Sequence, residues 1–462
     1  MSDQPLQSES ITPSTQKVDF SLTRKILTMT VPVVMGRYAE TTVEMIQIFM
    51  IGMLGPVSLS AYGLARAFTR VLFTAMMSIS RGALTMVAQA IGADSMEEAS
   101  AATKQAFSLL LGLSIVFGAG SLALSPFLLP TLTSDPEVIA LGTPFLQVFF
   151  IGVPFMTLNR AITSCLQGAG DTRTPFFLSV LSSTVQIVVS YVFIFGHWGM
   201  PELGVVGAAV GGLLGRSLAT ILGLGLLYSG RLALTLLPNT SYRFDWGVAH
   251  RILKIGVPSG LQGILRNSSG LVYLKLIAMS ALSTTAIAAY TIGHQMESIL
   301  RRTGQAYGTV ATALVGQHLG AQDPEGAERN GWTTIVISVL TNTLLVLPVA
   351  ALAKQFMAVF TTVPEIISTG AIYLYAIVVA EPFSCASNTS EGGLRGAGDT
   401  RPPMYYTLIT HWLIRLPAAY VLAFWLDYDI NGIWAALVIF SVVQAFLTVR
   451  RFRQGHWKTR KI

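Results

Sequence analysis

The chain has 462 residues, of which 52% are hydrophobic and only 11% are charged, whereas an ordinary soluble domain carries roughly 25% charged residues. Together with a mean hydropathy of +0.59, this composition excludes a soluble globular protein and predicts an integral membrane protein. The formal net charge of +7 comes largely from short loops, as described below, so it does not indicate a nucleic-acid partner.

The first half of the chain contains six segments long enough to cross a bilayer, which takes about 20 residues of helix. Residues 1–20 precede them and are polar without a hydrophobic core, so we expect a flexible cytoplasmic tail and not a cleaved signal peptide. The six segments form a predicted N-lobe at 21–230 and cover residues 23–54, 57–92, 99–130, 136–168, 173–197 and 203–230.

A predicted cytoplasmic linker at 231–248 leads to six further segments, which form a predicted C-lobe at 249–450. The chain ends in a basic stretch at 451–462, which we expect to be a cytoplasmic tail. The expected fold class is therefore an all-α membrane protein with twelve transmembrane helices. The segments of the second half cover residues 249–280, 285–320, 325–357, 364–396, 401–427 and 430–450.

Two motifs occur once in each half at the same spacing. The hexapeptide GAGDTR occupies 168–173 and 396–401, and VAQAIGA at 87–93 matches VGQHLGA at 315–321. Both separations are 228 residues (396 − 168 and 315 − 87), about half of the chain. A repeat of this length indicates a duplicated protein, so we expect two pseudo-symmetric bundles of six helices.

The GAGDTR motif has the composition of a tight connector between two helices. Glycine favours the end of a helix, Asp and Thr cap the start of the next one, and Pro follows in its first turn. We therefore predict a structural connector that holds a positive charge at the membrane surface, with a direct role in gating as the alternative. The motif residues are Gly168, Gly170, Asp171 and Arg173 in the first half and Gly396, Gly398, Asp399 and Arg401 in the second.

Lys and Arg gather in alternate loops, on the same side as the two termini, and the opposite loops such as LTSDPEV and LDYDING contain none. Because positive charge marks cytoplasmic loops, we expect both termini and both GAGDTR connectors to face the cytoplasm, in a multi-pass protein of the plasma membrane. Cys165 and Cys385 fall inside predicted helices, and no Cys or His spacing suggests a metal site. The sequence also lacks a nucleophile–base pair and a phosphate-binding loop, so it does not indicate an enzyme.

Ionisable residues within the predicted helices mark function or pairing, because each costs roughly 2.5 to 3.5 kcal/mol to insert. Arg37, Glu40 and Glu44 lie at i, i+3 and i+7 and share one face of the first helix. The second helix carries a basic stripe of Arg66, Arg70 and Arg81. When residues are counted from the external ends of the first and second helices, Glu44 and Arg66 lie at a similar depth in the membrane, and so do Glu40 and Arg70. Two interpretations stay open, namely ion or proton coupling by the carboxylates and structural salt bridges between the helices.

The predicted helices of the second half also carry more positive than negative charge within the membrane. Their basic residues are Arg266, Lys275, Arg301 and Arg302, and the acid among them is Glu297. Glu297 and Arg301 are at i and i+4 and are expected to pair. Across both halves the cations outnumber the acids, which favours anionic or zwitterionic cargo.

The duplicated GAGDTR-x-P, together with VAQ-x-IGA and VGQ-x-LGA, resembles the multidrug and toxic compound extrusion (MATE) family over nearly the whole chain. The resemblance implies a V-shaped pair of six-helix bundles that exports a small organic substrate in exchange for Na⁺ or H⁺, as a monomer in the lipid bilayer without other cofactors. A flippase for lipids or lipid-linked glycans is the alternative function, because a basic cavity suits phosphate groups.

The chain departs from the family where coupling carboxylates are usual. Gln47, Ser190, Arg266 and Ser384 occupy those positions, and Gln186 stands where an asparagine is usual, which leaves the coupling ion open. The carboxylates that we expect to replace them are Glu40, Glu44, Glu297 and Glu381. The expected cavity residues are Arg37, Gln47, Arg66, Arg70, Gln186, Arg266 and Arg301.

Overall fold

The computed structural model describes residues 20–237 and 243–459, except for the side chains of residues 70–75. The predicted tail at 1–20 therefore lies outside the described residues, apart from Phe20, with which the first helix begins. The regular secondary structure of the described residues is helical throughout.

The first half forms six long helices whose ends lie within a few residues of the predicted ones. They are α1 (Phe20–Gly52), α2 (Pro56–Gly92), α3 (Met96–Leu128), α4 (Pro136–Gly168), α5 (Arg173–Phe195) and α6 (Val205–Tyr228). Single 3₁₀ turns follow α3 at Leu129–Thr131 and α5 at His197–Gly199. Side-chain caps and prolines explain several boundaries, since Ser95 caps α3, Asp135 caps α4, and Pro56 and Pro136 begin α2 and α4.

The second half repeats this order with two differences. The long helices are α7 (Trp246–Ala278), α8 (Ser283–Gly320), α9 (Pro324–Ala351), α11 (Pro364–Gly396) and α14 (Asp429–Arg453), and a short helix α10 (Ala353–Phe360) follows α9. The segment predicted as one helix over 401–427 is a continuous rod that alternates α12 (Arg401–Leu408), a π segment (Ile409–Arg415), α13 (Leu416–Tyr420) and a second π segment (Val421–Trp425).

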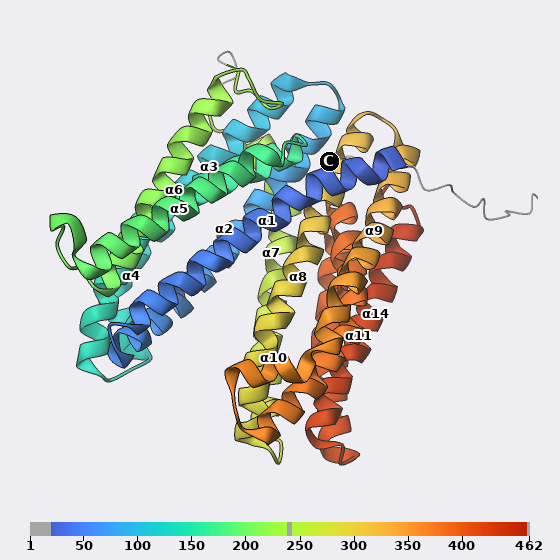
Figure 1. The fold of residues 1–462 in the computed structure, drawn as a ribbon. Coiled ribbons are helices and arrows are strands. Elements are labelled where there is room, and N and C mark those ends of the chain that lie inside the picture. Colours follow the sequence, from blue (N-terminus) through green and yellow to red (C-terminus); the bar gives the residue numbers. More distant parts are fainter. Residues whose placement is uncertain (1–19, 238–242, 460–462) are drawn as a thin grey trace, which may run out of the picture.

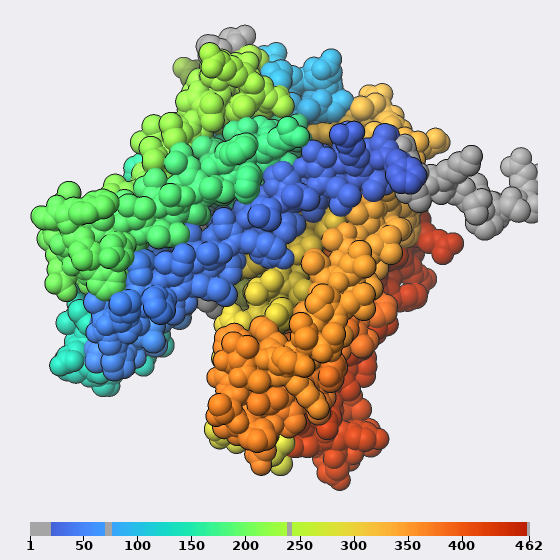
Figure 2. All heavy atoms as spheres, in the orientation of Figure 1, coloured from blue at the N-terminus to red at the C-terminus, as the bar shows by residue number. Residues whose placement is uncertain are grey.

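The helices form two lobes joined at one end. Figure 1 shows the N-lobe (α1–α6, blue to green) and the C-lobe (α7–α14, yellow to red) diverging away from the end where the C-terminus lies. In the space-filling view the wedge between them is visible as a hollow (Figure 2). The first turns of α1 reach across to the C-lobe, where Leu22, Ile26 and Met29 pack with Tyr307 and Leu314 of α8.

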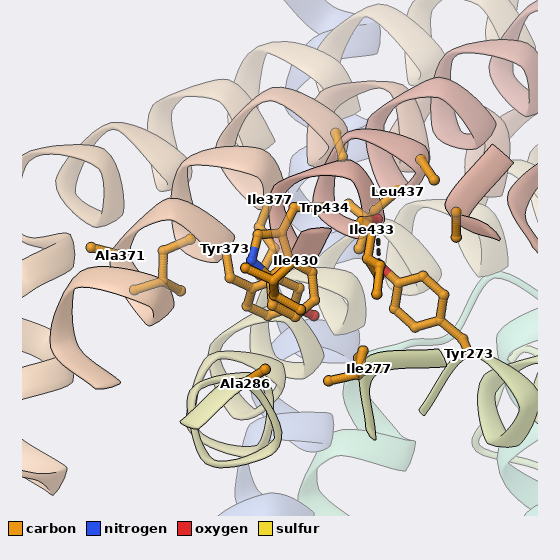
Figure 3. Packing of buried hydrophobic residues seen from close by; sticks show 14 of the residues in the cluster. Tyr273, Ile277, Ala286, Ala371, Tyr373, Ile377, Ile430, Ile433, Trp434 and Leu437 are labelled. Atoms are coloured by element: carbon orange, nitrogen blue, oxygen red, sulfur yellow. Dashed lines mark hydrogen bonds between the residues drawn. The ribbon is translucent and has the colours of Figure 1, made fainter. Parts of the chain in front are cut away.

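The largest apolar core lies in the C-lobe and is built around three aromatic side chains. Trp434 of α14 packs against Tyr373 of α11 with ring centroids 4.5 Å apart, and Tyr273 of α7 donates a 2.8 Å hydrogen bond to the Ile433 carbonyl (Figure 3). A buried hydroxyl satisfied in this way carries no desolvation penalty. Helices α7, α11 and α14 of the C-lobe therefore share one packed core.

The end of the chain corrects the prediction of a purely basic tail at 451–462. Helix α14 continues to Arg453, and both Phe452 and Trp457 are fully buried against α9 and α11. Arg451 forms an ion pair with Asp399 at 2.9 Å. Residues 451–459 are therefore part of the C-lobe.

The two lobes are fastened together by the repeated motifs at the end near the termini. The Gln89 amide of α2 donates to the Gly396 carbonyl at 3.0 Å, and the Gln317 amide of α8 donates to the Gly168 carbonyl at 2.9 Å. Each glutamine thus binds the connector of the opposite lobe, and the two bonds are related by the 228-residue repeat. We call this set of four residues the interlobe clasp.

The clasp requires α2 and α8 to cross closely. A Cβ atom added to Gly92 would lie 1.8 Å from the Gln317 carbonyl oxygen, and one added to Gly320 would lie 2.0 Å from that of Gln89. Both distances are far shorter than any real contact, so a larger side chain at either position would force the lobes apart. These glycines are the ends of VAQAIG and VGQHLG, which explains why both motifs are kept in the two halves of this chain.

The GAGDTR connectors have the predicted local structure at their first residues. Helices α4 and α11 end at Gly168 and Gly396, and Gly170 and Gly398 take left-handed backbone angles (φ 88° and 73°), which glycine adopts without strain. Arg173 and Arg401 are exposed at the surface. The connector role is thus supported, but the clasp gives its glycine carbonyls an additional role between the lobes.

Candidate transport cavity

Two adjoining cavities lie between and within the lobes. The first, which we call the arginine chamber, has a volume of about 150 Å³ and is lined by α1, α2, α4, α5, α7, α8 and α11. The second, the N-lobe cavity, has a volume of about 440 Å³. Both are lined by Glu40, Arg160 and Ser179, so the two cavities adjoin at these side chains.

The arginine chamber has a strong excess of positive charge. Five arginines and two glutamates line it, which gives 5 − 2 = +3. The N-lobe supplies Arg37, Arg81 and Arg160, and the C-lobe supplies Arg266 and Arg395. Only Arg37 and Arg266 were expected in the cavity from the sequence, whereas Arg81 was predicted as part of the basic stripe.

Few carboxylates compensate these arginines. Arg37 donates to Gln305 and Thr309 of α8 at 3.3 and 3.4 Å, and Arg81 donates to the Ser259 carbonyl at 3.4 Å. Arg266 lies 3.6 Å from Glu391. A guanidinium carries five N–H donors, and these contacts use at most two of them on each of Arg37, Arg81 and Arg266.

Glu391 is the acid of the chamber that the sequence analysis did not single out. It is buried in α11 and accepts hydrogen bonds from Gln262 at 2.8 Å and Gln444 at 2.9 Å, in addition to the contact with Arg266. The signal for it was available, because a carboxylate inside a membrane helix indicates a functional or paired residue.

The N-lobe cavity contains the two carboxylates predicted on the first helix. Glu44 pairs with Arg66 at 2.8 Å, which confirms the pairing expected from their depth, and Glu40 lies 3.9 Å from Arg160 of α4. The predicted neighbour of Glu40 was Arg70, whose side chain lies outside the described residues. The Glu40 and Glu44 side chains are 45% and 44% exposed, so both can be reached from the cavity.

Two predicted polar residues lie deeper in this cavity. The Gln47 amide donates to Ser190 at 3.0 Å and to the Ala208 carbonyl at 3.2 Å, and Gln186 lines the same wall. By the family resemblance, Gln47 stands in place of an acid and Gln186 in place of an asparagine. They therefore supply dipoles to the cavity, and no charge.

The remaining predicted residues form a separate group in the C-lobe. Glu297 and Arg301 are 3.2 Å apart, which confirms the expected i, i+4 pair, and Tyr373 donates to Glu297 at 2.5 Å. Glu381 is buried in α11. Neither of the two cavities is lined by Glu297, Arg301 or Glu381, so the structure does not bring them together with Glu40 and Glu44.

The comparisons with known proteins identify the family. The MatE family model matches residues 32–192 and 258–421, which together cover more than half of the chain. The chain belongs to the MatE family. The two matched segments begin 226 residues apart (258 − 32), and their extents agree with a duplicated transporter.

Curated relatives and solved structures agree with this assignment. A probable multidrug resistance protein NorM of Thermotoga maritima is 26% identical over 422 residues, covering 88% of this chain and 86% of the relative. The probable multidrug resistance protein YpnP of Bacillus subtilis is 24% identical, covering 95% of this chain and 96% of the relative. A transporter of the MOP superfamily from Pyrococcus furiosus, described as having a binding pocket of reverse polarity, superimposes with a TM-score of 0.86 at 19% identity, covering 95% and 97% of the two chains.

The family confirms the resemblance read from the repeated motifs and the twelve-helix fold. MatE proteins are membrane transporters and not enzymes, so the chain is a multi-pass transporter of a multidrug-efflux family. Among the described residues, no group of three or more His, Cys, Asp or Glu could hold a metal ion.

Proposed function

We propose that this MatE protein is a secondary active exporter that exchanges Na⁺ or H⁺ for small organic compounds by alternating access of its two lobes. The observation that carries the proposal is the position of Glu40 and Glu44, two half-exposed carboxylates on one wall of the cavity between the lobes, each beside an arginine. A site of this kind, between two repeats that meet near the bilayer centre, is how many secondary transporters bind their substrates.

The orientation follows from the distribution of Lys and Arg, which places the termini and the clasp in the cytoplasm. In this orientation the wedge opens to the outside and the clasp closes the cytoplasmic end. A MATE transporter structure described as outward-facing superimposes with a TM-score of 0.85 at 20% identity, which supports the same assignment. We propose a monomer in the plasma membrane that requires only the bilayer, its cargo and the coupling ion.

Coupling would use the competition between an arginine and a cation for the same carboxylate. When Glu44 binds Na⁺ or a proton, its attraction to Arg66 weakens, because the carboxylate charge is neutralised. Arg66 is then available to the cavity, and the helices α1 and α2 can shift relative to each other. Glu297 and Glu381 are candidates for a second coupling position within the C-lobe.

Replacing the two carboxylates tests this proposal. Glu40→Gln and Glu44→Gln keep the side-chain shape but remove the charge, so we expect folding to be preserved and ion-driven export to fall at least ten-fold. Export is measured in inverted vesicles with an imposed Na⁺ gradient and then an imposed pH gradient. Glu365→Gln, which changes an exposed glutamate at the start of α11, is the matched control. Wild-type rates in both variants under both gradients would contradict the coupling role.

A further inference from the structure

The arginine chamber contains more positive charge than the protein itself neutralises. Glu391 is already engaged by Gln262, Gln444 and Arg266, and Glu40 lies at the edge shared with the N-lobe cavity. Arg37, Arg266 and Arg395 line the same chamber as Arg81. Like charges held together in a membrane protein are costly unless a counter-ion joins them.

Buried donors in the chamber also lack partners. The Arg266 Nε–H group is fully buried and has no hydrogen-bond acceptor among the described residues. The Arg395 side chain lines the chamber and makes no hydrogen bond to the described residues, whereas its backbone carbonyl accepts from the Thr85 hydroxyl and the Gly398 N–H. A guanidinium pairs best with a planar or tetrahedral oxyanion, which it binds through two parallel hydrogen bonds.

The dimensions of the two cavities specify the shape of the ligand. The arginine chamber, at about 150 Å³, holds roughly five water volumes and therefore admits an anionic group but not a complete drug-sized molecule. The adjoining N-lobe cavity is about three times larger, and Phe145, Phe149 and Met156 form an apolar part of its otherwise polar wall. Pockets of this kind take the uncharged body of a ligand.

We propose that the chamber and the N-lobe cavity together bind a soluble amphiphilic organic anion, with its carboxylate, phosphate or sulfonate among Arg81, Arg266 and Arg395 and its apolar body in the N-lobe cavity. This inference rests on the proposed export function for its physiological meaning, but the binding itself does not require transport. Because Arg81 and Arg395 come from opposite lobes, the bound anion bridges the lobes directly above the clasp.

Equilibrium binding to the purified full-length protein in detergent tests the inference without transport. Fluorescein and rhodamine 123 share a xanthene ring system but carry opposite charge, so they form a matched pair of probes. We expect fluorescein to bind at least ten-fold more tightly than rhodamine 123 and to weaken as NaCl is raised. Tighter binding of rhodamine 123 would overturn the inference.

Arginine variants locate the site. Arg81→Gln and Arg395→Gln should each weaken fluorescein binding about ten-fold and leave rhodamine 123 binding unchanged or stronger, because each removes one charge-assisted pair. Arg81→Lys keeps the charge but not the paired donors, so its affinity for fluorescein should lie between those of wild type and Arg81→Gln. This variant still tests the site if Arg81→Gln fails to fold. Arg251→Gln removes an exposed arginine of α7 and is the control. Equal fluorescein affinity in all four variants would refute the proposed site.

Competition distinguishes the possible anions. We expect unlabelled benzoate derivatives and aryl phosphates to displace fluorescein. If only inorganic phosphate displaces fluorescein, the site binds a small inorganic ion. If only phosphatidylglycerol in nanodiscs displaces it, the site belongs to lipid transport. Either result would overturn the inference. If fluorescein binds as expected but is not exported from vesicles, the export function fails and the anion site stands.

Discussion

Residues at equivalent positions of the two repeats have taken different roles. Asp171 accepts hydrogen bonds from the backbone N–H groups of Arg173 and Thr174, both at 3.0 Å, and so caps α5 as predicted. Asp399 is fully buried and pairs with Arg451 of α14 at 2.9 Å. The cap could be predicted from local sequence, but the ion pair could not, because it depends on where the last helix returns to the connector.

The two aspartates should therefore differ in their effect on stability. Asp171→Ala should cost about 1 kcal/mol, as expected for a lost helix cap, whereas Asp399→Ala should cost about 2 to 3 kcal/mol because it removes a charge-assisted bond inside the protein. Thermal unfolding in detergent measures both. Removing Arg451 in the Asp399→Ala background should add little further loss, and equal melting temperatures for the two single variants would contradict this distinction.

The charged residues of the cavity show the same limit of sequence reasoning. The pairs Glu44–Arg66 and Glu297–Arg301 follow from helix depth and from i, i+4 spacing, and both were predicted. Arg160 is the only charge beyond the first turn of α4, and Arg395 shares α11 with Glu381 and Glu391; neither arginine has a charged counterpart in the other repeat. Their gathering in one chamber results from the approach of the two lobes, which no local pattern encodes.

At the scale of helices, polarity indicates which elements face the wedge. Eight helical segments of the described chain are long and apolar enough to cross a membrane by composition alone. The four that fail this test, α1, α2, α7 and α8, are also long, but charges interrupt them. These helices make the most extensive contacts across the lobe boundary, in the pairs α2·α7, α2·α8 and α1·α8. The helix positions could be predicted because such charges are few enough to leave each apolar run recognisable.

The π segments of the helix over 401–425 could not be predicted, because the apolar pattern does not distinguish π from α turns. The first segment carries Arg415, which is buried and lies 3.7 Å from the Tyr273 ring centroid and 4.9 Å from that of Phe440. Two aromatic faces thus take the place of a carboxylate. π segments often occur at functional sites, and here the irregular turn carries a buried cation at the C-lobe core.

Replacing this cation should destabilise the C-lobe. Arg415→Met keeps most of the side-chain volume but removes the charge, so we expect a loss of about 2 kcal/mol, the value of a desolvated cation–π contact, measured as a lower melting temperature. Arg450→Met changes an arginine that lies 6.0 Å from the Phe446 ring and should have a much smaller effect. A neutral or stabilising Arg415→Met would show that aromatic packing alone holds this region.

At the scale of the whole molecule, the clasp joins the two lobes at the closed end of the wedge. Its two hydrogen bonds join helix ends of opposite lobes, and each is worth about 1 kcal/mol. Two such bonds contribute about 2 kcal/mol to the joined arrangement, which is the size of free-energy difference that separates two conformations of one protein. The sequence analysis identified the two motifs as a repeat but could not assign their contact, because it crosses between the copies.

Removing both clasp bonds should shift this equilibrium toward closure of the open end. In Gln89→Leu/Gln317→Leu, spin labels at Ser134 and Thr362, exposed positions in loops at the open end, should report a larger population of short distances. Both native cysteines are buried, so they should take up little label. Gln454→Leu, an exposed glutamine after α14, is the control. An unchanged distance distribution in the double variant would show that the glutamines are not part of the gate.

The reciprocal geometry of the clasp also bears on how the chain arose. Position 89 of the first copy contacts position 396 of the second, and position 317 of the second contacts position 168 of the first. Subtracting 228 from each C-lobe number turns both contacts into the same one, between 89 and 168. An interface in which one patch contacts its own equivalent is the isologous interface of a two-fold homodimer. The contact is therefore of the kind that an ancestral six-helix protein could have formed with a second copy of itself before the two genes were fused.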